Sequence, residues 1–178
     1  MIHNKYSIIS LLVCSVSFFS CGKEYPNLSV VEDVDLNRYS GKWYEVARLP
    51  NRFQKNCLCS IAEYSIIDSL TIRVVNKCKL ENGEVKSVKG KAFVVSKGKL
   101  KVQFFFPFRG DYWILDLDRE NYTYAIIGTP DRKYFWILSR NPNLSDEKIE
   151  QLLSFLKSNQ FDTSNVIISN KNCIDSNL

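Results

Sequence analysis

Residues 37–48 read Asn-Arg-Tyr-Ser-Gly-Lys-Trp-Tyr-Glu-Val-Ala-Arg. Residues 43–49 are predicted to form a β-strand, whose successive side chains point to opposite faces. If Trp43 points inward, alternation gives one inward set and one outward set. The inward set is Trp43, Glu45, Ala47 and Leu49, and the outward set is Tyr44, Val46 and Arg48.

Downstream of this strand, short strand-forming stretches alternate with turn signals. With residues 43–49, the predicted strands number eight and the others cover residues 61–67, 71–77, 85–95, 99–106, 112–117, 122–128 and 135–139. The turns include Ser96-Lys97-Gly98, where Gly suits a positive φ, and Thr129-Pro130-Asp131. Regular spacing of this kind is typical of an antiparallel sandwich or barrel. A closed eight-stranded barrel would leave room for one small ligand, whereas a sandwich would be filled.

One amphipathic helix follows the strands. Ser145 is a suitable N-cap, and acidic residues follow it in the first turn, where the helix dipole favours negative charge. The apolar stripe consists of Ile149, Leu152, Leu153 and Leu156. We therefore expect the helix to pack against the outside of the sheet, and residues 166–168 to form a short last strand.

The N-terminus has the pattern of an export signal. Lys5 precedes an apolar run over residues 8–19, which is too short to span a bilayer. Residues 1–20 are predicted to be the signal and residues 21–34 a polar tether. Ser20-Cys21 resembles the cleavage site of a bacterial lipoprotein, so we expect Cys21 to be acylated, with two or three chains needed for stable anchoring. Ordinary cleavage nearby, leaving a free thiol, is the alternative.

Composition restricts the chemistry. The only histidine, His3, lies in the predicted signal, so the mature chain has none. Ser-His-Asp and Cys-His catalysis and zinc sites built on imidazole are thereby excluded. Cys57 and Cys59 have no second pair to complete a metal site, so neither a metal nor a cofactor is expected. The net charge falls from +5 to +4 with the signal, without a basic cluster, which argues against nucleic acid.

Three blocks of sequence together resemble the lipocalin family. Residues 37–48 resemble its opening Gly-x-Trp motif followed by Tyr-Glu, residues 117–126 its second block, and residues 134–140 its third, which ends in Arg140. The resemblance covers residues 35–173, leaves residues 174–178 as a tail, and is closest to bacterial outer-membrane lipocalins and apolipoprotein D. It implies an all-β fold, an eight-stranded antiparallel up-and-down barrel with one C-terminal flanking helix. It also implies binding of a fatty acid or lysophospholipid.

Within that resemblance, individual residues acquire roles. Gly41, Trp43 and Arg140 are expected to be structural, with the Arg140 guanidinium lying over the Trp43 indole at the closed end. Alternation and resemblance together give the expected ligand-binding set: Glu45, Ala47, Phe104, Tyr112, Trp136 and Leu138. A buried carboxylate at Glu45 needs a partner, for which Arg73 or a tyrosine hydroxyl could serve.

The four cysteines of the predicted domain allow three disulfide pairings. Resemblance to apolipoprotein D implies Cys59–Cys173, which leaves Cys57–Cys78. A two-residue loop at Asp68-Ser69 would instead place Cys59 directly opposite Cys78, so the pairing stays open at this stage.

The expected function is therefore non-enzymatic: a monomeric or homodimeric lipocalin, lipid-anchored in the bacterial outer membrane, that carries a small hydrophobic ligand. A filled barrel acting as an envelope interaction or stress lipoprotein is the first alternative. A cysteine-dependent isomerase is the second, and it would require a free thiol among Cys57, Cys59 and Cys78.

Overall fold

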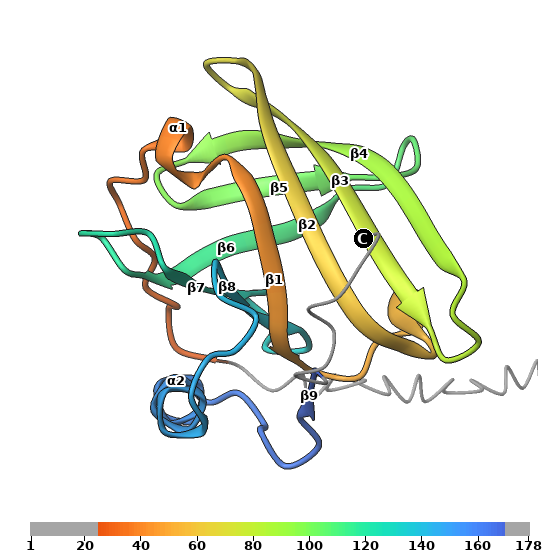
Figure 1. Ribbon diagram of the computed structural model, residues 1–178. Helices are drawn as coiled ribbons and strands as arrows, with labels where there is room; N and C mark the ends of the chain where they lie inside the picture. Colours follow the sequence, from red (N-terminus) through yellow and green to blue (C-terminus); the bar gives the residue numbers. More distant parts are fainter. Residues whose placement is uncertain (1–24, 170–178) are drawn as a thin grey trace, which may run out of the picture.

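The structure, a computed structural model, describes residues 25–169 (Figure 1). The elements in chain order are α1 Leu36–Tyr39, β1 Gly41–Arg48, the 3-10 helix η1 Arg52–Gln54, β2 Cys57–Asp68, β3 Thr71–Leu80, β4 Val85–Ser96, β5 Lys99–Gln103, β6 Gly110–Leu117, β7 Tyr124–Gly128, β8 Phe135–Ser139, α2 Asp146–Ser158 and β9 Ile167–Ile168. Among the described residues, no helix is long and apolar enough to cross a membrane.

Strands β1 to β8 form a closed antiparallel barrel. Each strand pairs with the next along the chain, and β1 pairs with both β2 and β8, which closes the ring. The short β9 pairs with the far end of β1, at Ala47 and Arg48. The predicted up-and-down barrel is confirmed, and the open sandwich is excluded.

Most strands differ by a few residues in their ends from the sequence prediction, and β5 and β7 are shorter than predicted for identifiable reasons. Strand β5 ends at Gln103, three residues earlier than predicted. The chain turns there, with Phe108 N donating to Phe105 O (2.9 Å), and Pro107 has no N–H to donate to a neighbouring strand. Strand β7 begins at Tyr124 because Tyr122 adopts a positive φ of 56° inside the preceding turn.

The apolar side chains form two clusters, one inside the barrel and one outside it. The inner cluster contains Trp43, Tyr64, Val74, Ile114 and Leu138, together with residues from the remaining strands β4, β5 and β7. The outer cluster fills the space between the barrel and α2, whose four predicted stripe residues are all buried. The helix begins as predicted, since the Ser145 hydroxyl accepts from Lys148 N (3.2 Å).

Strand β1 contains a β-bulge that reverses the alternation predicted for its second half. The register shifts between Glu45 and Ala47, so Glu45 is opposite Leu138 while Ala47 is opposite Ile137. Ala47 consequently packs in the outer cluster, and Arg48, opposite Trp136, turns inward and is buried. The predictions that Ala47 points inward and Arg48 outward are wrong, because a bulge inserts one residue into the alternation.

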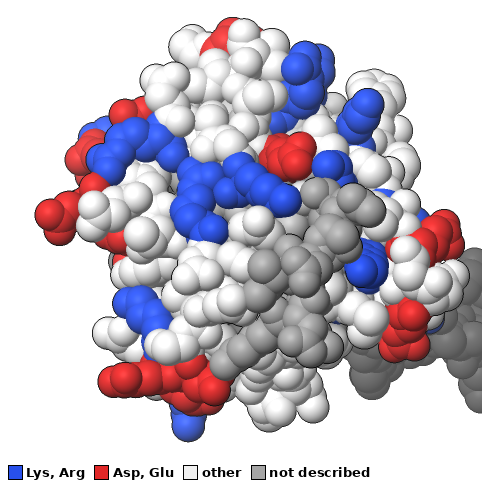
Figure 2. Space-filling model, in the orientation of Figure 1, with Lys and Arg blue, Asp and Glu red and all other residues white. Residues whose placement is uncertain are grey.

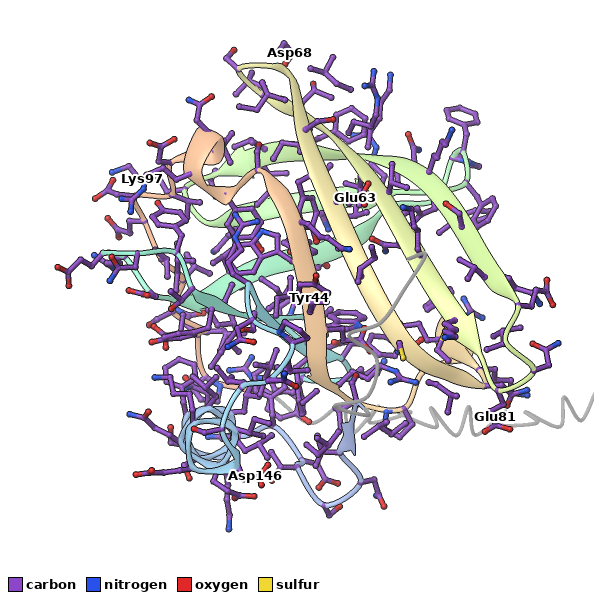
Figure 3. All side chains as sticks on the ribbon, in the orientation of Figure 1. Tyr44, Glu63, Asp68, Glu81, Lys97 and Asp146 are labelled. Carbon is purple, nitrogen blue, oxygen red and sulfur yellow. A yellow bond between two sulfur atoms is a disulfide. The ribbon has the colours of Figure 1, made fainter. Side chains whose placement is uncertain are left out.

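Residues 25–34 pack against the barrel and do not extend away from it as a polar spacer. Leu28 and Val31 are buried, and Val31 N donates to Ile114 O (2.9 Å). Lys97, labelled in Figure 3, lies 3.9 Å from Glu32 and 3.6 Å from Asp33. The predicted tether is therefore not free over its described part.

The up-and-down topology gives the barrel two distinct ends. The closed end carries α1 and the turns β2–β3, β4–β5 and β6–β7, whereas the open end carries η1 and the turns β3–β4, β5–β6 and β7–β8. Figure 3 marks the two ends of the β2–β3 hairpin by Asp68 and Glu81. On the face shown in Figure 2, basic side chains are interspersed with acidic and uncharged ones.

Candidate ligand site in the barrel interior

Trp43 and Arg140 seal the closed end of the barrel. The Arg140 guanidinium carbon lies 3.8 Å from the centroid of the Trp43 ring, which is fully buried. Arg140 also donates to four backbone carbonyls, those of Arg38, Tyr39, Ser40 and Lys42, at 2.6–3.1 Å. The Trp43 indole N–H donates to Tyr39 O (2.7 Å). The predicted contact is present, and its function is to hold α1 across the barrel floor.

Gly41 has a physical reason to precede this tryptophan. Its φ is +93°, which L side chains rarely adopt, and a Cβ there would lie 3.3 Å from Arg140 Nη1. Glycine therefore allows the chain to leave α1 for β1 beneath the guanidinium.

Above this floor, three tyrosine hydroxyls meet in the interior. Tyr112 OH lies 2.7 Å from Tyr39 OH and 2.9 Å from Tyr64 OH. Burial raises the pKa of Tyr64 to about 12 and raises the pKa of both Tyr39 and Tyr112 well above 10, so all three stay neutral. Three hydroxyl protons share two hydrogen bonds, so one O–H remains as a donor for a further acceptor.

Nearer the open end lies a buried ion pair. Arg48 Nη1 lies 3.1 Å from Glu45 Oε1, and both side chains are almost completely buried. Burial raises the pKa of Glu45, while the charge of Arg48 and the hydrogen bond from Gln54 oppose that rise. Glu45 faces inward as predicted, but its partner is Arg48, which the sequence analysis had placed outside, and not Arg73.

Gln54 of η1 connects this pair to the wall of the barrel. Its amide nitrogen donates to Glu45 Oε2 (2.5 Å) and Ser60 Oγ (3.1 Å). Its amide oxygen accepts from Trp136 Nε1 (3.0 Å) and from Asn51 Nδ2 (2.8 Å). Arg48 Nη2 also donates to Gln54 O (3.2 Å) and Cys57 O (3.3 Å). The side chains of Gln54, which was not among the predicted site residues, and Arg48 thus fasten the segment between β1 and β2 across the open end.

Five of the six expected lining residues lie in or against the inner cluster. Leu138 is a buried member, and the half-buried Phe104, Tyr112 and Trp136 pack against it. Glu45 shares their face through the β1–β8 register, whereas Ala47 does not. The interior therefore combines an aromatic wall with a few polar groups, an arrangement typical of small-molecule sites.

Two buried polar atoms of the interior have hydrogen-bonding capacity that no described residue satisfies. These atoms are Arg48 Nε, a donor, and Asn76 Oδ1, an acceptor. Asn76 lies opposite Ala62 and Val88 on the inward face of β3. Unsatisfied buried groups are rare in native proteins, and a bound polar group is one explanation for them.

The disulfide Cys57–Cys78 joins β2 to β3 at the open end, with 5.6 Å between the Cα atoms. Cys78 pairs in register with Ser60 and not with Cys59, because the hairpin turns at Ser69-Leu70 with a shift after Ile66. The prediction of a two-residue loop at Asp68-Ser69 is therefore wrong. Cys59 also takes part in a disulfide. Its predicted partner Cys173 lies outside the described residues, as does Cys21.

Comparison with known proteins agrees with this geometry. The family model for a lipocalin-like domain matches residues 34–171. The outer membrane lipoprotein Blc of Vibrio cholerae is 40% identical over 163 residues, with 89% of this chain and 95% of the relative covered. Apolipoprotein D of Bos taurus is 35% identical, with coverage of 89% and 88%. Insecticyanin of Manduca sexta has a TM-score of 0.66 at 29% identity, with coverage of 83% and 86%.

The name of the bacterial relative supports a lipid-anchored localisation at the outer membrane. The features of this structure agree with the matched family: the barrel is closed, Trp43 and Arg140 form its floor, and a helix flanks it. The chain belongs to the lipocalin family.

Proposed function

We propose that this protein binds a single-chain amphiphile, a fatty acid or lysophospholipid, in the barrel interior and carries it at the outer membrane. The observation that supports the proposal is the pairing of an aromatic interior wall with buried polar atoms that lack partners within residues 25–169. An acyl chain suits the wall formed by Phe104 and Trp136, and its oxygens suit Arg48 Nε and the remaining tyrosine O–H.

The energetics favour an acyl chain. Burying a chain of about 12–16 methylenes contributes roughly 10–13 kcal/mol gross at ~0.8 kcal/mol per methylene. Association and ordering remove a large part of that free energy. The remainder corresponds to a dissociation constant between micromolar and nanomolar.

The disulfide state of the cysteines favours a binding protein over a cysteine-dependent enzyme. An isomerase would need one free thiol among Cys57, Cys59 and Cys78, but Cys57 and Cys78 are joined in a disulfide and Cys59 also takes part in one. Lipocalins and the lipoproteins similar to this chain are binding and transport proteins. We therefore propose a carrier rather than an enzyme.

Titration with a fatty acid tests the proposal through tryptophan fluorescence. Trp136 borders the interior, whereas Trp113 packs against the outer cluster with Lys99 Nζ 4.1 Å from its ring. We expect oleate to quench the emission of the wild-type protein. Trp136→Phe should lose most of that quenching, and the matched control Trp113→Phe should keep it. Absence of quenching and of probe displacement by any acyl ligand would favour the filled-barrel alternative.

A further inference from the structure

The open end of the barrel carries exposed aromatic side chains on two of its connections. Phe53 of η1 is 68% exposed, and in the β5–β6 turn Phe105, Phe106 and Phe108 are 68%, 88% and 77% exposed. Large exposed apolar patches mark interaction sites. The inner cluster is complete without these side chains, so packing in the barrel does not account for them.

Apolar exposure alone does not choose which end meets a partner. The closed end also exposes Ile66, Ile67, Leu70 and Val95, the last two by 60% and 63%. The position of the N-terminal segment separates the two ends.

That segment is held at the open end. Arg132, in the β7–β8 turn, donates to Pro26 O (2.6 Å), and its guanidinium carbon lies 4.9 Å from the Tyr25 ring centroid. The same turn meets η1, since the rings of Phe53 and Tyr134 are 6.4 Å apart. The described chain therefore begins at the open end, beside the β7–β8 turn and on the side of η1.

Chain length then limits where a lipid anchor can lie. Cys21 precedes Tyr25 by four residues, and four fully extended residues span at most about 14 Å. An acylated Cys21 cannot reach a bilayer at the closed end, because residues 25–34 are packed on the barrel and supply no slack.

Basic side chains accompany the aromatic ones. The Arg52 guanidinium lies 4.9 Å from the Phe53 ring centroid, and Arg109, directly after Phe108, lies 4.2 Å from that of Phe93. Aromatic residues flanked by cations are suited to a membrane–water interface with anionic lipid. At the closed end, the acidic residues Asp68, Asp118 and Glu120 accompany the basic Lys97 and Arg119 and none of the four exposed phenylalanines.

We propose that the open end faces the bilayer, with Phe53, Phe105, Phe106 and Phe108 inserted at its surface, so that ligand passes between membrane and barrel without crossing water. The anchor at Cys21 and the aromatic turns then act as two attachments to the same membrane. This inference rests on the proposed function for the anchor and the ligand, but it concerns orientation, which ligand affinity does not report.

Paired tryptophan reporters test the orientation. The mature chain, acylated at Cys21, is reconstituted in vesicles of phosphatidylethanolamine and phosphatidylglycerol containing lipids brominated near the headgroup. We expect the added emission of Phe106→Trp to shift to the blue and to be quenched. The equally apolar closed-end control Val95→Trp should show neither effect. Quenching of the Val95→Trp reporter, or of neither reporter, would overturn the proposal.

Transfer kinetics give a second readout. Phe105→Asp/Phe106→Asp should slow uptake of a fluorescent lysophospholipid from these vesicles by roughly tenfold or more, because each aspartate removes a buried aromatic contact with lipid. Leu70→Asp/Val95→Asp should leave the rate unchanged. Equal rates in all variants would contradict the proposal. Oleate binding by the same variants in solution reports separately on the proposed function.

Discussion

Arg140 and Trp43 show how one contact serves two purposes at the residue scale. The guanidinium covers the indole and at the same time satisfies four carbonyls of the entering chain. Lysine cannot reproduce this, because an ammonium lacks the planar fork that reaches several acceptors.

Replacing this arginine should destabilise the barrel without changing its ligand. We expect Arg140→Met to lower the free energy of unfolding by about 2–4 kcal/mol, since charged hydrogen bonds and a cation–π contact are lost together. Urea unfolding measures the change. The exposed Arg109→Met is the matched control and should stay within about 0.5 kcal/mol of the wild type. An Arg140→Met variant as stable as the wild type would contradict the structural role.

The Glu45–Arg48 pair makes stability depend on pH. Burial raises the pKa of Glu45, so the folded protein holds a proton that the unfolded chain releases. Its contribution to the free energy of unfolding is therefore present below about pH 4.5 and is lost as pH rises through the folded pKa.

Removing the arginine should strengthen this dependence. In Arg48→Met the charge that lowers the pKa of Glu45 is gone, so stability should fall more steeply than in the wild type as pH rises above about 4.5. The double variant Glu45→Gln/Arg48→Met should lose the dependence. Urea unfolding at several pH values tests both statements, and parallel pH profiles for the wild type and Arg48→Met would refute them.

At the scale of elements, η1 is the least anticipated part of the site. Gln54 fastens the β1–β2 segment to Glu45, Ser60 and Trp136, although it belongs to a connection and not to a strand. A segment held by a few polar contacts can open at modest cost and so control access to the interior.

Cutting this fastening should speed ligand exchange. We expect Gln54→Ala to raise the dissociation rate of a bound fluorescent fatty acid by roughly fivefold to tenfold, which corresponds to about one hydrogen bond. Stopped-flow displacement measures the rate. Gln151→Ala on the exposed face of α2 provides the control. Unchanged dissociation from the Gln54→Ala protein would mean that the segment does not gate the site.

Sequence periodicity predicted the strands and helix well because each has one apolar face, as the stripe of α2 illustrates. It failed where an element departs from periodicity. Because of the bulge after Glu45, Arg48 and not Ala47 lies on the inward face, and nothing in residues 43–49 marks an inserted residue. Gln54 and Tyr39 enter the site from short helices outside the barrel, so strand alternation does not apply to them.

For the whole molecule, the two ends of the barrel have separate tasks. At the closed end, α1, Trp43 and Arg140 form the floor. At the open end, Gln54 and Arg48 hold the η1 segment, and several phenylalanines are exposed. In the carrier proposed above, the ligand enters and leaves by the open end only.

Lipid retained by the natively purified, full-length protein tests the carrier account most directly. Native mass spectrometry, followed by extraction and lipid analysis, would identify any molecule that the barrel holds. We expect one single-chain fatty acid or lysophospholipid per barrel, lost when Trp136→Phe is combined with Phe104→Ala. A protein that carries no lipid and acquires none from vesicles would contradict the account.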